Sequence, residues 1–277
     1  MTTVKPHFHY VERGNKKGPT IVFLHGWPDT DRIFAKQYEA MEKTYRLVSF
    51  QLPFYAKLDS HKWPRYSGFS FDELSEMFAT GVQLAMGDQA SVSESLRAKP
   101  VLICHDWGAV ISYHTLSKYP DLFSKVVALD IGQHVGHLGV KAKLMVVWYQ
   151  WTLIWAFLLP SFIGTFLTRM VATLFKAPAD RSLIHGRMGY LYVRMWMGLL
   201  SGSLPPSLKF FQPPKIPILY MYGAKKPFFF HSKKWIEHVQ KQPGSAVMPF
   251  ASDHWFFARS SCAADVNREI LKFIAAE

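Results

Sequence analysis

The chain has 277 residues, of which 49% are hydrophobic, so it is long enough for one large α/β domain with an insertion and a sizeable core. Its formal net charge of +12 favours anionic partners such as lipid headgroups or nucleic acid. The basic residues are scattered, and the sequence has no RNA-module signature or zinc-finger spacing, which argues against nucleic acid and leaves attraction to a membrane surface open.

Two features of the sequence bear on the cellular compartment. The N-terminal stretch MTTVKPHFHY has no apolar run followed by a small-residue cleavage site, so we expect no signal peptide. Cys104 and Cys262 have no metal-ligand spacing and no partner nearby in sequence, which is typical of reduced thiols. We therefore expect a cytoplasmic protein.

Short apolar runs alternate with amphipathic stretches in the first half of the chain, a pattern typical of βαβ units and a mostly parallel sheet. The runs at 20–26 and 45–50 have the length of buried strands. Ser70 and Glu73 have the spacing of a capping box, which predicts that a helix begins there. The next predicted elements are a strand at 101–105, a helix at 109–118 and a strand at 125–131.

The same pattern returns near the C-terminus. The predicted elements are a strand at 216–223, a helix at 234–241, a strand at 246–250 and a closing helix from 264. The segment before them lacks β-type runs and is rich in Trp, Tyr, Phe and Met, which indicates an inserted helical lid. We therefore divide the chain into a first core part at 1–134, a lid at 135–212 and a second core part at 213–277.

The longest apolar segment, 144–168, contains no charged side chain and is long enough for a transmembrane helix. A single span would leave the strand before Asp106 and the C-terminal strands on opposite sides of the bilayer, where they could not share a sheet. Apolar side chains at helical spacing favour a lid helix that packs on the core. They are Leu144, Trp148, Trp151, Trp155 and Leu158.

A third interpretation is a lid that dips into the membrane interface without crossing it. Basic residues flank the apolar segment and would meet anionic headgroups, so peripheral membrane contact through the lid stays open. These residues are Lys141, Lys143, Arg169, Lys176 and Arg181.

The motif HDWGA places Asp106 between a predicted strand and a predicted helix. This is the position of a nucleophile elbow, where the side chain stands above the sheet and the backbone N–H of the next residue is free to donate. The usual occupant is serine, whereas a carboxylate there can attack carbon directly and form an alkyl ester. The ester then needs a histidine that activates water for its hydrolysis.

Three motifs in order carry a family resemblance: HGWP at 25–28, HDWGA at 105–109 and SDHWFF at 252–257. With these motifs the chain resembles the α/β-hydrolase fold, and within it the group that holds epoxide hydrolases and haloalkane dehalogenases. The resemblance covers nearly the whole chain. It implies an α/β fold with a mostly parallel, eight-stranded-type sheet flanked by helices, and an inserted helical lid.

The position after the last predicted strand makes His254 the candidate base. The resemblance places the acid that orients this histidine after the strand at 216–223, but residues 224–227 contain no carboxylate. One dehalogenase group and a related marine luciferase carry the acid after the preceding strand, which makes Asp130 the candidate third member of the triad with Asp106. The structural alternative for Asp130 is an acid that caps a turn at the strand end.

The backbone N–H groups of Trp27 and Trp107 are candidate oxyanion donors. In dehalogenases that resemble this chain, the indole at Trp107 also holds the leaving halide, usually with an Asn at the position of Trp27 or with a lid Trp. The HGWP form looks more like epoxide hydrolases, which need lid tyrosines to give a proton to the opening ring oxygen. The candidates are Tyr149, Tyr190 and Tyr192.

Four functions stay open on these residues. The leading one is hydrolysis of a hydrophobic epoxide to a diol through an ester on Asp106, and haloalkane dehalogenation is second. A cofactor-independent oxygenase resembling the marine luciferase is third. A non-catalytic scaffold is fourth, suggested by the missing acid after 216–223 and by QLPFY at 51–55. The sequence shows no phosphate loop, metal-ligand cluster or dinucleotide fingerprint, so we expect a small hydrophobic substrate and neither a metal nor an organic cofactor.

Overall fold

The structure is a computed structural model, and it describes residues 6–55, 68–87 and 99–276. Within these residues the chain forms a seven-stranded sheet in the order β1-β3-β2-β4-β5-β6-β7. β1 pairs with β3 in antiparallel orientation, and all the other neighbours are parallel. The strands are β1 (His9–Gly14), β2 (Thr20–Leu24), β3 (Arg46–Gln51), β4 (Val101–His105), β5 (Lys125–Leu129), β6 (Ile218–Gly223) and β7 (Ala246–Phe250).

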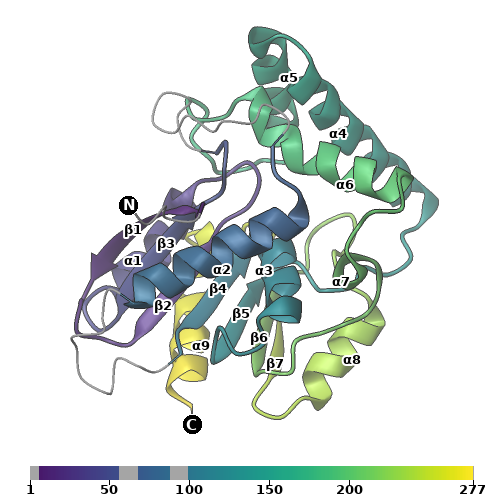
Figure 1. The fold of residues 1–277 in the computed structure, drawn as a ribbon. Helices are drawn as coiled ribbons and strands as arrows, with labels where there is room; N and C mark the ends of the chain where they lie inside the picture. Colours follow the sequence, from purple (N-terminus) through teal and green to yellow (C-terminus); the bar gives the residue numbers. More distant parts are fainter. Residues whose placement is uncertain (1–5, 56–67, 88–98, 277) are drawn as a thin grey trace.

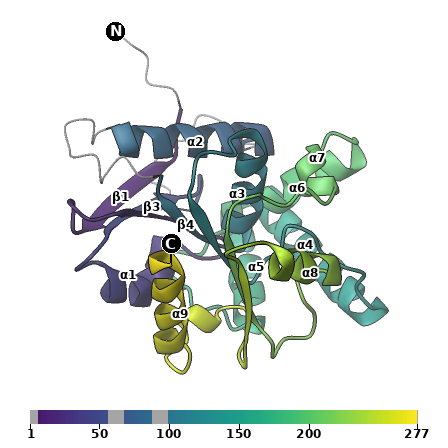
Figure 2. The ribbon, with the colours of Figure 1, turned by 90° about the horizontal axis from the view of Figure 1, so that it is seen from below.

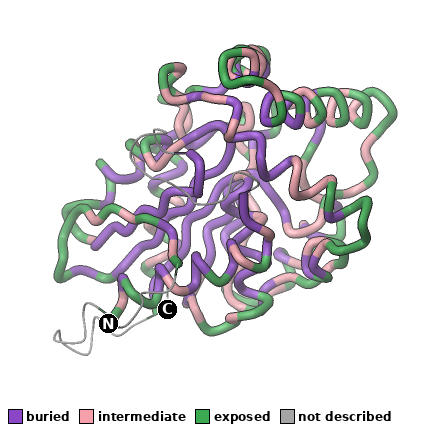
Figure 3. The backbone as a smooth tube through the Cα atoms, turned by 45° about the horizontal axis from the view of Figure 1, so that its top comes forward, coloured by how far each residue is buried: buried purple, intermediate pink, exposed green. Residues whose placement is uncertain are grey.

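Helices cover both faces of this sheet. α2, α3 and α8 lie on one face and α1 and α9 on the other (Figure 1 and Figure 2). Because both faces are covered, β2, β3 and β4 are buried at every residue, and Figure 3 shows this buried interior. The helices are α1 (Ala35–Met41), α2 (Phe71–Gly87), α3 (Trp107–Lys118), α8 (Lys233–Lys241) and α9 (Ala263–Ala275).

The predicted α/β fold with a mostly parallel sheet is confirmed, with seven strands in the described residues where the resemblance implied eight. The capping box is confirmed as well. The backbone N–H of Ser70 donates to the Glu73 carboxylate at 2.8 Å, and the backbone N–H of Glu73 donates to the Ser70 hydroxyl at 3.2 Å. α2 therefore begins where the sequence predicts, because these two bonds satisfy donors at the helix start.

The lid helices lie between β5 and β6 in the chain, and α4, α5 and α6 lie above the sheet in Figure 1. They fall within the predicted insertion at 135–212. Leu159 is extended and Pro160 follows it, so the long apolar segment is split into two helices. Within the described residues, no helix combines the length and the apolarity needed to cross a membrane. The lid helices are α4 (Val140–Leu158), α5 (Ser161–Leu174), α6 (Tyr190–Leu200) and the short α7 (Pro206–Lys209).

The prediction of which α4 side chains pack on the core was wrong. Leu144, Trp148, Trp151, Trp155 and Leu158 are all exposed, and Leu144 keeps 66% of its surface. The buried side of α4 consists instead of Tyr149, Leu153, Ile154, Ala156 and Phe157. Because α4 is apolar around most of its circumference, helical spacing alone could not distinguish its inner side from its outer side.

A close approach of α5 to α4 determines how the lid packs. A Cβ on Gly164 of α5 would lie 2.0 Å from the backbone oxygen of Ala156 in α4, closer than any carbon can stand. The glycine thus permits the two helix backbones to touch. This contact turns the Ala156 side of α4 inward and its opposite side toward solvent.

Replacing Gly164 by Ala should lower the free energy of unfolding by about 1–3 kcal/mol, because the new methyl group overpacks the α4–α5 contact. Urea denaturation of the two proteins measures the difference. Gly87→Ala at the end of α2 is the matched control, since a Cβ there meets nothing within 4 Å. The control should be neutral or slightly stabilising, and equal losses in both variants would contradict the close contact.

Candidate active site

Asp106 lies at the sharp turn between β4 and α3. Its φ is 51°, in the left-handed region that residues with a side chain rarely adopt. The turn also requires a close approach of the chain, because a Cβ on Gly108 would lie 2.2 Å from the backbone oxygen of Leu24. The start of α3 is thereby held against β2, and the Asp106 carboxylate is held above the carboxyl end of the sheet.

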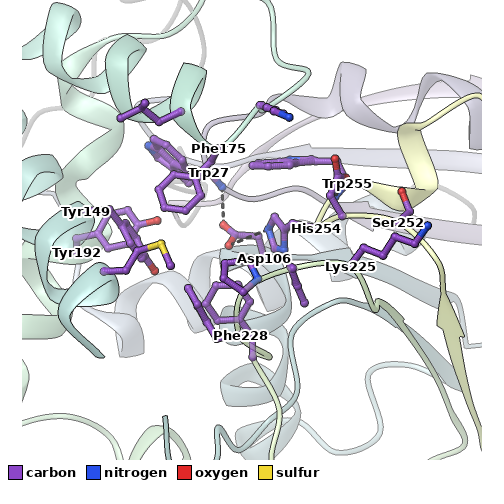
Figure 4. A pocket seen from close by; sticks show the side chains of 17 residues that line it. Trp27, Asp106, Tyr149, Phe175, Tyr192, Lys225, Phe228, Ser252, His254 and Trp255 are labelled. Atoms are coloured by element: carbon purple, nitrogen blue, oxygen red, sulfur yellow. Dashed lines mark hydrogen bonds and ion pairs between the residues drawn. The ribbon is translucent and has the colours of Figure 1, made fainter. Parts of the chain in front are cut away.

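The structure brings the three predicted triad residues together. His254 follows β7, and its Nε2 lies 3.6 Å from Asp106 Oδ2 (Figure 4). Its Nδ1 lies 2.5 Å from Oδ2 of Asp130, which directly follows β5 and is completely buried. The other Asp130 oxygen accepts the backbone N–H of Gly223 at 2.9 Å. The imidazole is therefore held between two carboxylates.

Charge and burial oppose each other at this triad. Burial by itself lowers the pKa of His254, but attraction to Asp130 and the hydrogen bonds to both carboxylates raise it to about 9. Burial raises the pKa of Asp106, yet the hydrogen bond and charge of His254 outweigh it, so that pKa is lowered. The same balance lowers the pKa of Asp130 to about 2. At neutral pH a protonated His254 thus lies between two ionised carboxylates.

The two predicted oxyanion donors both reach Asp106. The backbone N–H of Trp27 donates to Asp106 Oδ1 at 2.7 Å, and the backbone N–H of Trp107 hydrogen-bonds to the same carboxylate. The Trp107 ring packs edge-on against Tyr192, with the centroids 5.0 Å apart. The indole N–H of Trp27 is buried and has no hydrogen-bond partner among the described residues. The site therefore holds one polar donor that the protein itself does not use.

Asp106 opens into a cavity of about 550 Å³ between the lid and the core (Figure 4). Most of the side chains that line it are aromatic or aliphatic, such as Phe228 and Phe230 in the loop after β6. A second cavity of about 450 Å³ shares Asp106, Phe230 and two lid tyrosines with the first. Asp106 therefore lies where two largely apolar cavities meet.

Two of the three predicted lid tyrosines line these cavities. Tyr149 of α4 and Tyr192 of α6 line both of them, with ring centroids 5.9 Å apart. Burial raises the pKa of each phenol well above its usual value, so both keep their protons. Tyr190 lines neither cavity, because its ring packs against Phe54 and Gly68 instead. Tyr149 and Tyr192 therefore remain candidate proton donors, whereas Tyr190 is not one.

A protein-family model described as alpha/beta hydrolase fold matches residues 19–189. The chain belongs to the alpha/beta hydrolase fold family. It is 27% identical over 128 residues to Epoxide hydrolase 1 of Caenorhabditis elegans, covering 46% of this chain and 28% of that protein. It is 28% identical over 126 residues to Epoxide hydrolase 4 of Homo sapiens, covering 44% and 31%. The chain thus spans about a third of the length of the curated relatives it matches.

Solved structures share the fold. A variant of an epoxide hydrolase from Bacillus megaterium, solved with its diol product, has a TM-score of 0.67 at 19% identity over 97% of each chain. A haloalkane dehalogenase variant from Bradyrhizobium elkanii has a TM-score of 0.60 at 16% identity over 96% of this chain and 93% of that one. At these identities the similarity shows the fold alone. The chemistry of this chain depends on its own residues.

The loop after β6 in this hydrolase-fold chain supplies a lysine instead of a carboxylate. The Lys226 ammonium forms an ion pair with Asp130 Oδ2, the same oxygen that bonds to His254. The Lys226 side chain is 6% exposed, and burial lowers its pKa. The sequence shows that no carboxylate follows β6 at residues 224–227. It does not show which of the adjacent Lys225 and Lys226 pairs with Asp130, because that depends on the fold.

Asp29 is a second residue of the site that no sequence motif singled out. It is buried and accepts the indole N–H of Trp255 at 2.8 Å. Burial raises the pKa of Asp29 to about 7, with the Trp255 hydrogen bond opposing the rise and the Asp106 charge adding to it. The sequence feature that could have identified Asp29 as a site residue is its position directly after the HGWP motif. A carboxyl group that titrates near neutral pH therefore lies close to the triad.

Two buried histidines hold the loops around the triad. Nε2 of His25 accepts the backbone N–H of Leu52 at 3.2 Å, and Nε2 of His105 donates to the backbone oxygen of His254 at 3.3 Å. Burial lowers the pKa of His25 to about 4 and that of His105 to about 3, so both are neutral. Among the described residues, no group of three or more His, Cys, Asp or Glu side chains is arranged to hold a metal ion.

Replacing Lys226 by Met should raise the pKa of His254 above its value of about 9. The ammonium and the imidazole bond to the same carboxylate oxygen, so removing the ammonium removes a like charge that disfavours the protonated imidazole. NMR titration of the His254 ring in the wild type and the variant measures the change.

Lys225→Met is the matched control, because Lys225 is the exposed neighbour. It should leave the His254 pKa where it is in the wild type. An unchanged or lowered pKa in Lys226→Met, in a variant whose circular dichroism matches the wild type, would contradict the electrostatic role of the lysine.

Proposed function

We propose that this chain hydrolyses a hydrophobic epoxide to a diol through an alkyl ester on Asp106. The position of His254 carries the proposal, because its two ring nitrogens face the carboxylates of Asp106 and Asp130. Tyr149 and Tyr192 line the same cavity on the lid side (Figure 4). A nucleophile, a base with its orienting acid and two proton donors thus surround one space.

In the first step, a carboxylate oxygen of Asp106 attacks an epoxide carbon, and the bond between that carbon and the ring oxygen breaks. The lowered pKa of Asp106 keeps it ionised for this attack. The ring oxygen takes a proton from Tyr149 or Tyr192, which leaves a tyrosinate. The proton that His254 carries at neutral pH then passes to the tyrosinate through solvent, so both groups end this step neutral.

Ester formation itself prepares His254 to act as a base. The pKa of about 9 depends on two carboxylates, and esterification removes the negative charge of Asp106. Lys226 keeps its positive charge beside Asp130 throughout. The pKa of His254 therefore falls when the ester forms, and the imidazole releases its proton at the point where a neutral base is needed.

In the second step, His254 takes a proton from water and the hydroxide attacks the ester carbonyl carbon of Asp106. The backbone N–H groups of Trp27 and Trp107 stabilise the oxyanion that forms. When the intermediate collapses, the diol oxygen leaves and takes the proton of the new carboxyl group. Asp106 is again ionised and His254 again protonated, so the cycle closes with one water consumed.

The two cavities favour an extended apolar substrate. Asp106 lies at their junction, so a molecule with apolar groups on both sides of its epoxide ring can fill both. Aromatic and aliphatic side chains form most of the lining of both cavities. A lipid-derived epoxide with the ring inside its chain fits this shape better than a small polar epoxide.

Replacing His254 by Gln should trap the ester, because alkylation of Asp106 does not need the base whereas hydrolysis does. Diol turnover should fall by about 10²–10⁴-fold, the usual contribution of a general base. Mass spectrometry after incubation with a long-chain epoxide should show the substrate mass added to the peptide that contains Asp106. His137→Gln, at an exposed histidine, should turn over normally. Labelling at any other residue would exclude Asp106 as the nucleophile.

A second candidate is haloalkane dehalogenation, which the unpartnered indole N–H of Trp27 favours. Trp27 lines the same cavity as Asp106, and its buried indole N–H, which has no partner among the described residues, can bind a halide ion. The position of Asp130 after β5 favours it too. Two alternatives remain if neither diol nor halide is released and Asp106 stays unlabelled: a luciferase-like oxygenase and a non-catalytic scaffold. Light emission with an imidazopyrazinone would indicate the oxygenase, and its absence would indicate the scaffold.

The lid tyrosines distinguish the two hydrolytic reactions. Tyr149→Phe and Tyr192→Phe together should lower diol formation by about 10²–10⁴-fold, because the ring oxygen loses its acid. Halide release from a bromoalkane should be nearly unaffected, since a halide leaves without a proton. Tyr190→Phe is the matched control and should retain diol formation, because Tyr190 lines neither cavity. An equal loss in the control would remove the tyrosines as specific donors.

A further inference from the structure

The outer side of the lid presents a long row of exposed apolar side chains, which we call the lid stripe. Exposure is highest at Val140, with 74%, and at Phe162, with 76%. Figure 3 shows exposed residues along the outer side of the lid. The lid stripe consists of Val140, Leu144, Val147, Trp148, Trp151, Trp155 and Leu158 on α4, and Phe162 and Phe166 on α5.

The members of the lid stripe that belong to α4 form a single line along that helix. They follow one another at intervals of one, three or four residues, so they share one side of the helix. The opposite side, with Tyr149 and Leu153, is buried toward the cavity and the core. The contact at Gly164 holds this orientation, because α5 can approach α4 so closely only on the Ala156 side. The exposure is therefore built into the packing of the lid.

The Asp, Glu, Lys and Arg side chains of the segment that carries the lid stripe, 131–179, are all basic. Between Asp130 and Asp180 the sequence contains no Asp or Glu. Lys141 and Lys143 lie just outside the two edges of the stripe at the start of α4, and both are exposed. Two further exposed basic residues lie in α5 and just after it, Arg169 and Lys176. The chain as a whole carries a net charge of +12.

We propose that the lid stripe docks on an anionic lipid surface, with its tryptophans in the interface and Lys141 and Lys143 against the headgroups. Tryptophan is favoured at the membrane interface because its ring is apolar and its N–H is polar. A flat apolar line bordered by lysine is the pattern of a helix that lies in the interface plane. Anionic lipids supply the negative charge that the region between Asp130 and Asp180 lacks.

A second copy of this chain fits the lid stripe less well. In a symmetric dimer the same patch would face itself, so the basic lid segment of one copy would meet an equally basic segment, without Asp or Glu between 131 and 179, in the other. That arrangement costs electrostatic repulsion, whereas an anionic lipid surface attracts the same charges.

Docking would place the lid, and the cavity beneath it, next to the bilayer. Leu174 and Lys176, which line the cavity of Asp106, are exposed at and just after the end of α5. A hydrophobic substrate could then pass from the lipid to the cavity with little exposure to water. The docking itself does not depend on which reaction the site performs.

Sedimentation with vesicles tests the proposal on the full chain. Vesicles with 30% phosphatidylserine in phosphatidylcholine should bind the protein at low salt, and pure phosphatidylcholine vesicles should bind it far more weakly. Lys141→Gln with Lys143→Gln should weaken binding about 30-fold, from a factor of about five for each lysine near an anionic surface. Lys16→Gln with Lys17→Gln, at exposed lysines of the β1–β2 turn, is the matched control and should bind within about two-fold of the wild type.

The apolar part of the stripe is tested in the same way. Phe162→Ser should weaken binding at least about ten-fold, because the ring no longer enters the lipid. Phe210→Ser is its matched control, since Phe210 is 61% exposed at the end of α7 and outside the stripe. Brominated lipids should quench tryptophan emission in the wild type more strongly than in Trp148→Phe with Trp155→Phe.

Three results would overturn the proposal. The first is no binding to anionic vesicles at low salt. The second is binding that Phe162→Ser and Phe210→Ser weaken equally. The third is a dimer in analytical ultracentrifugation that Leu144→Ser with Phe162→Ser dissociates, which would assign the stripe to a second copy instead of a lipid surface.

Discussion

The completely buried Asp130 carboxylate joins the separate parts of the site. It accepts bonds from the imidazole of His254, the ammonium of Lys226 and the backbone N–H of Gly223. These donors come from the loop after β7, the loop after β6 and the end of β6, so one side chain holds three neighbouring strand ends together. A buried carboxylate is stable only with such partners, because its desolvation is otherwise too costly.

The charges of the site balance only when His254 is protonated. Asp106 and Asp130 then carry two negative charges, and His254 and Lys226 carry two positive ones. Modification of Asp106 to a neutral ester leaves one positive charge in excess in a buried region, which favours loss of a proton from the imidazole. Lys226 beside Asp130 thus connects the charge of Asp106 to the basicity of His254.

The lid illustrates a limit of periodicity as a guide to packing. The spacing of apolar residues predicted a helix in the region of α4, and the helix is there. The side predicted to face the core is exposed, because α4 is apolar nearly all round and the Gly164 contact selects the other side. A small residue on a neighbouring helix decided the orientation, and no pattern within α4 itself contains that information.

The sequence by itself determined the parallel α/β framework, the helix start at Ser70 and the candidate triad of Asp106, His254 and Asp130. Local patterns suffice for the framework and the helix start, because buried strands and capping boxes are short-range signals. Asp106 and His254 follow from their places after predicted strands, whereas Asp130 was chosen because of the family resemblance. Only the tertiary structure decided that Lys226 joins Asp130, that Tyr192 and not Tyr190 reaches the cavity, and that the tryptophans of α4 face outward. Each of these depends on contacts between segments far apart in the chain, where a rotation of a helix or loop by one residue changes which side chain is buried.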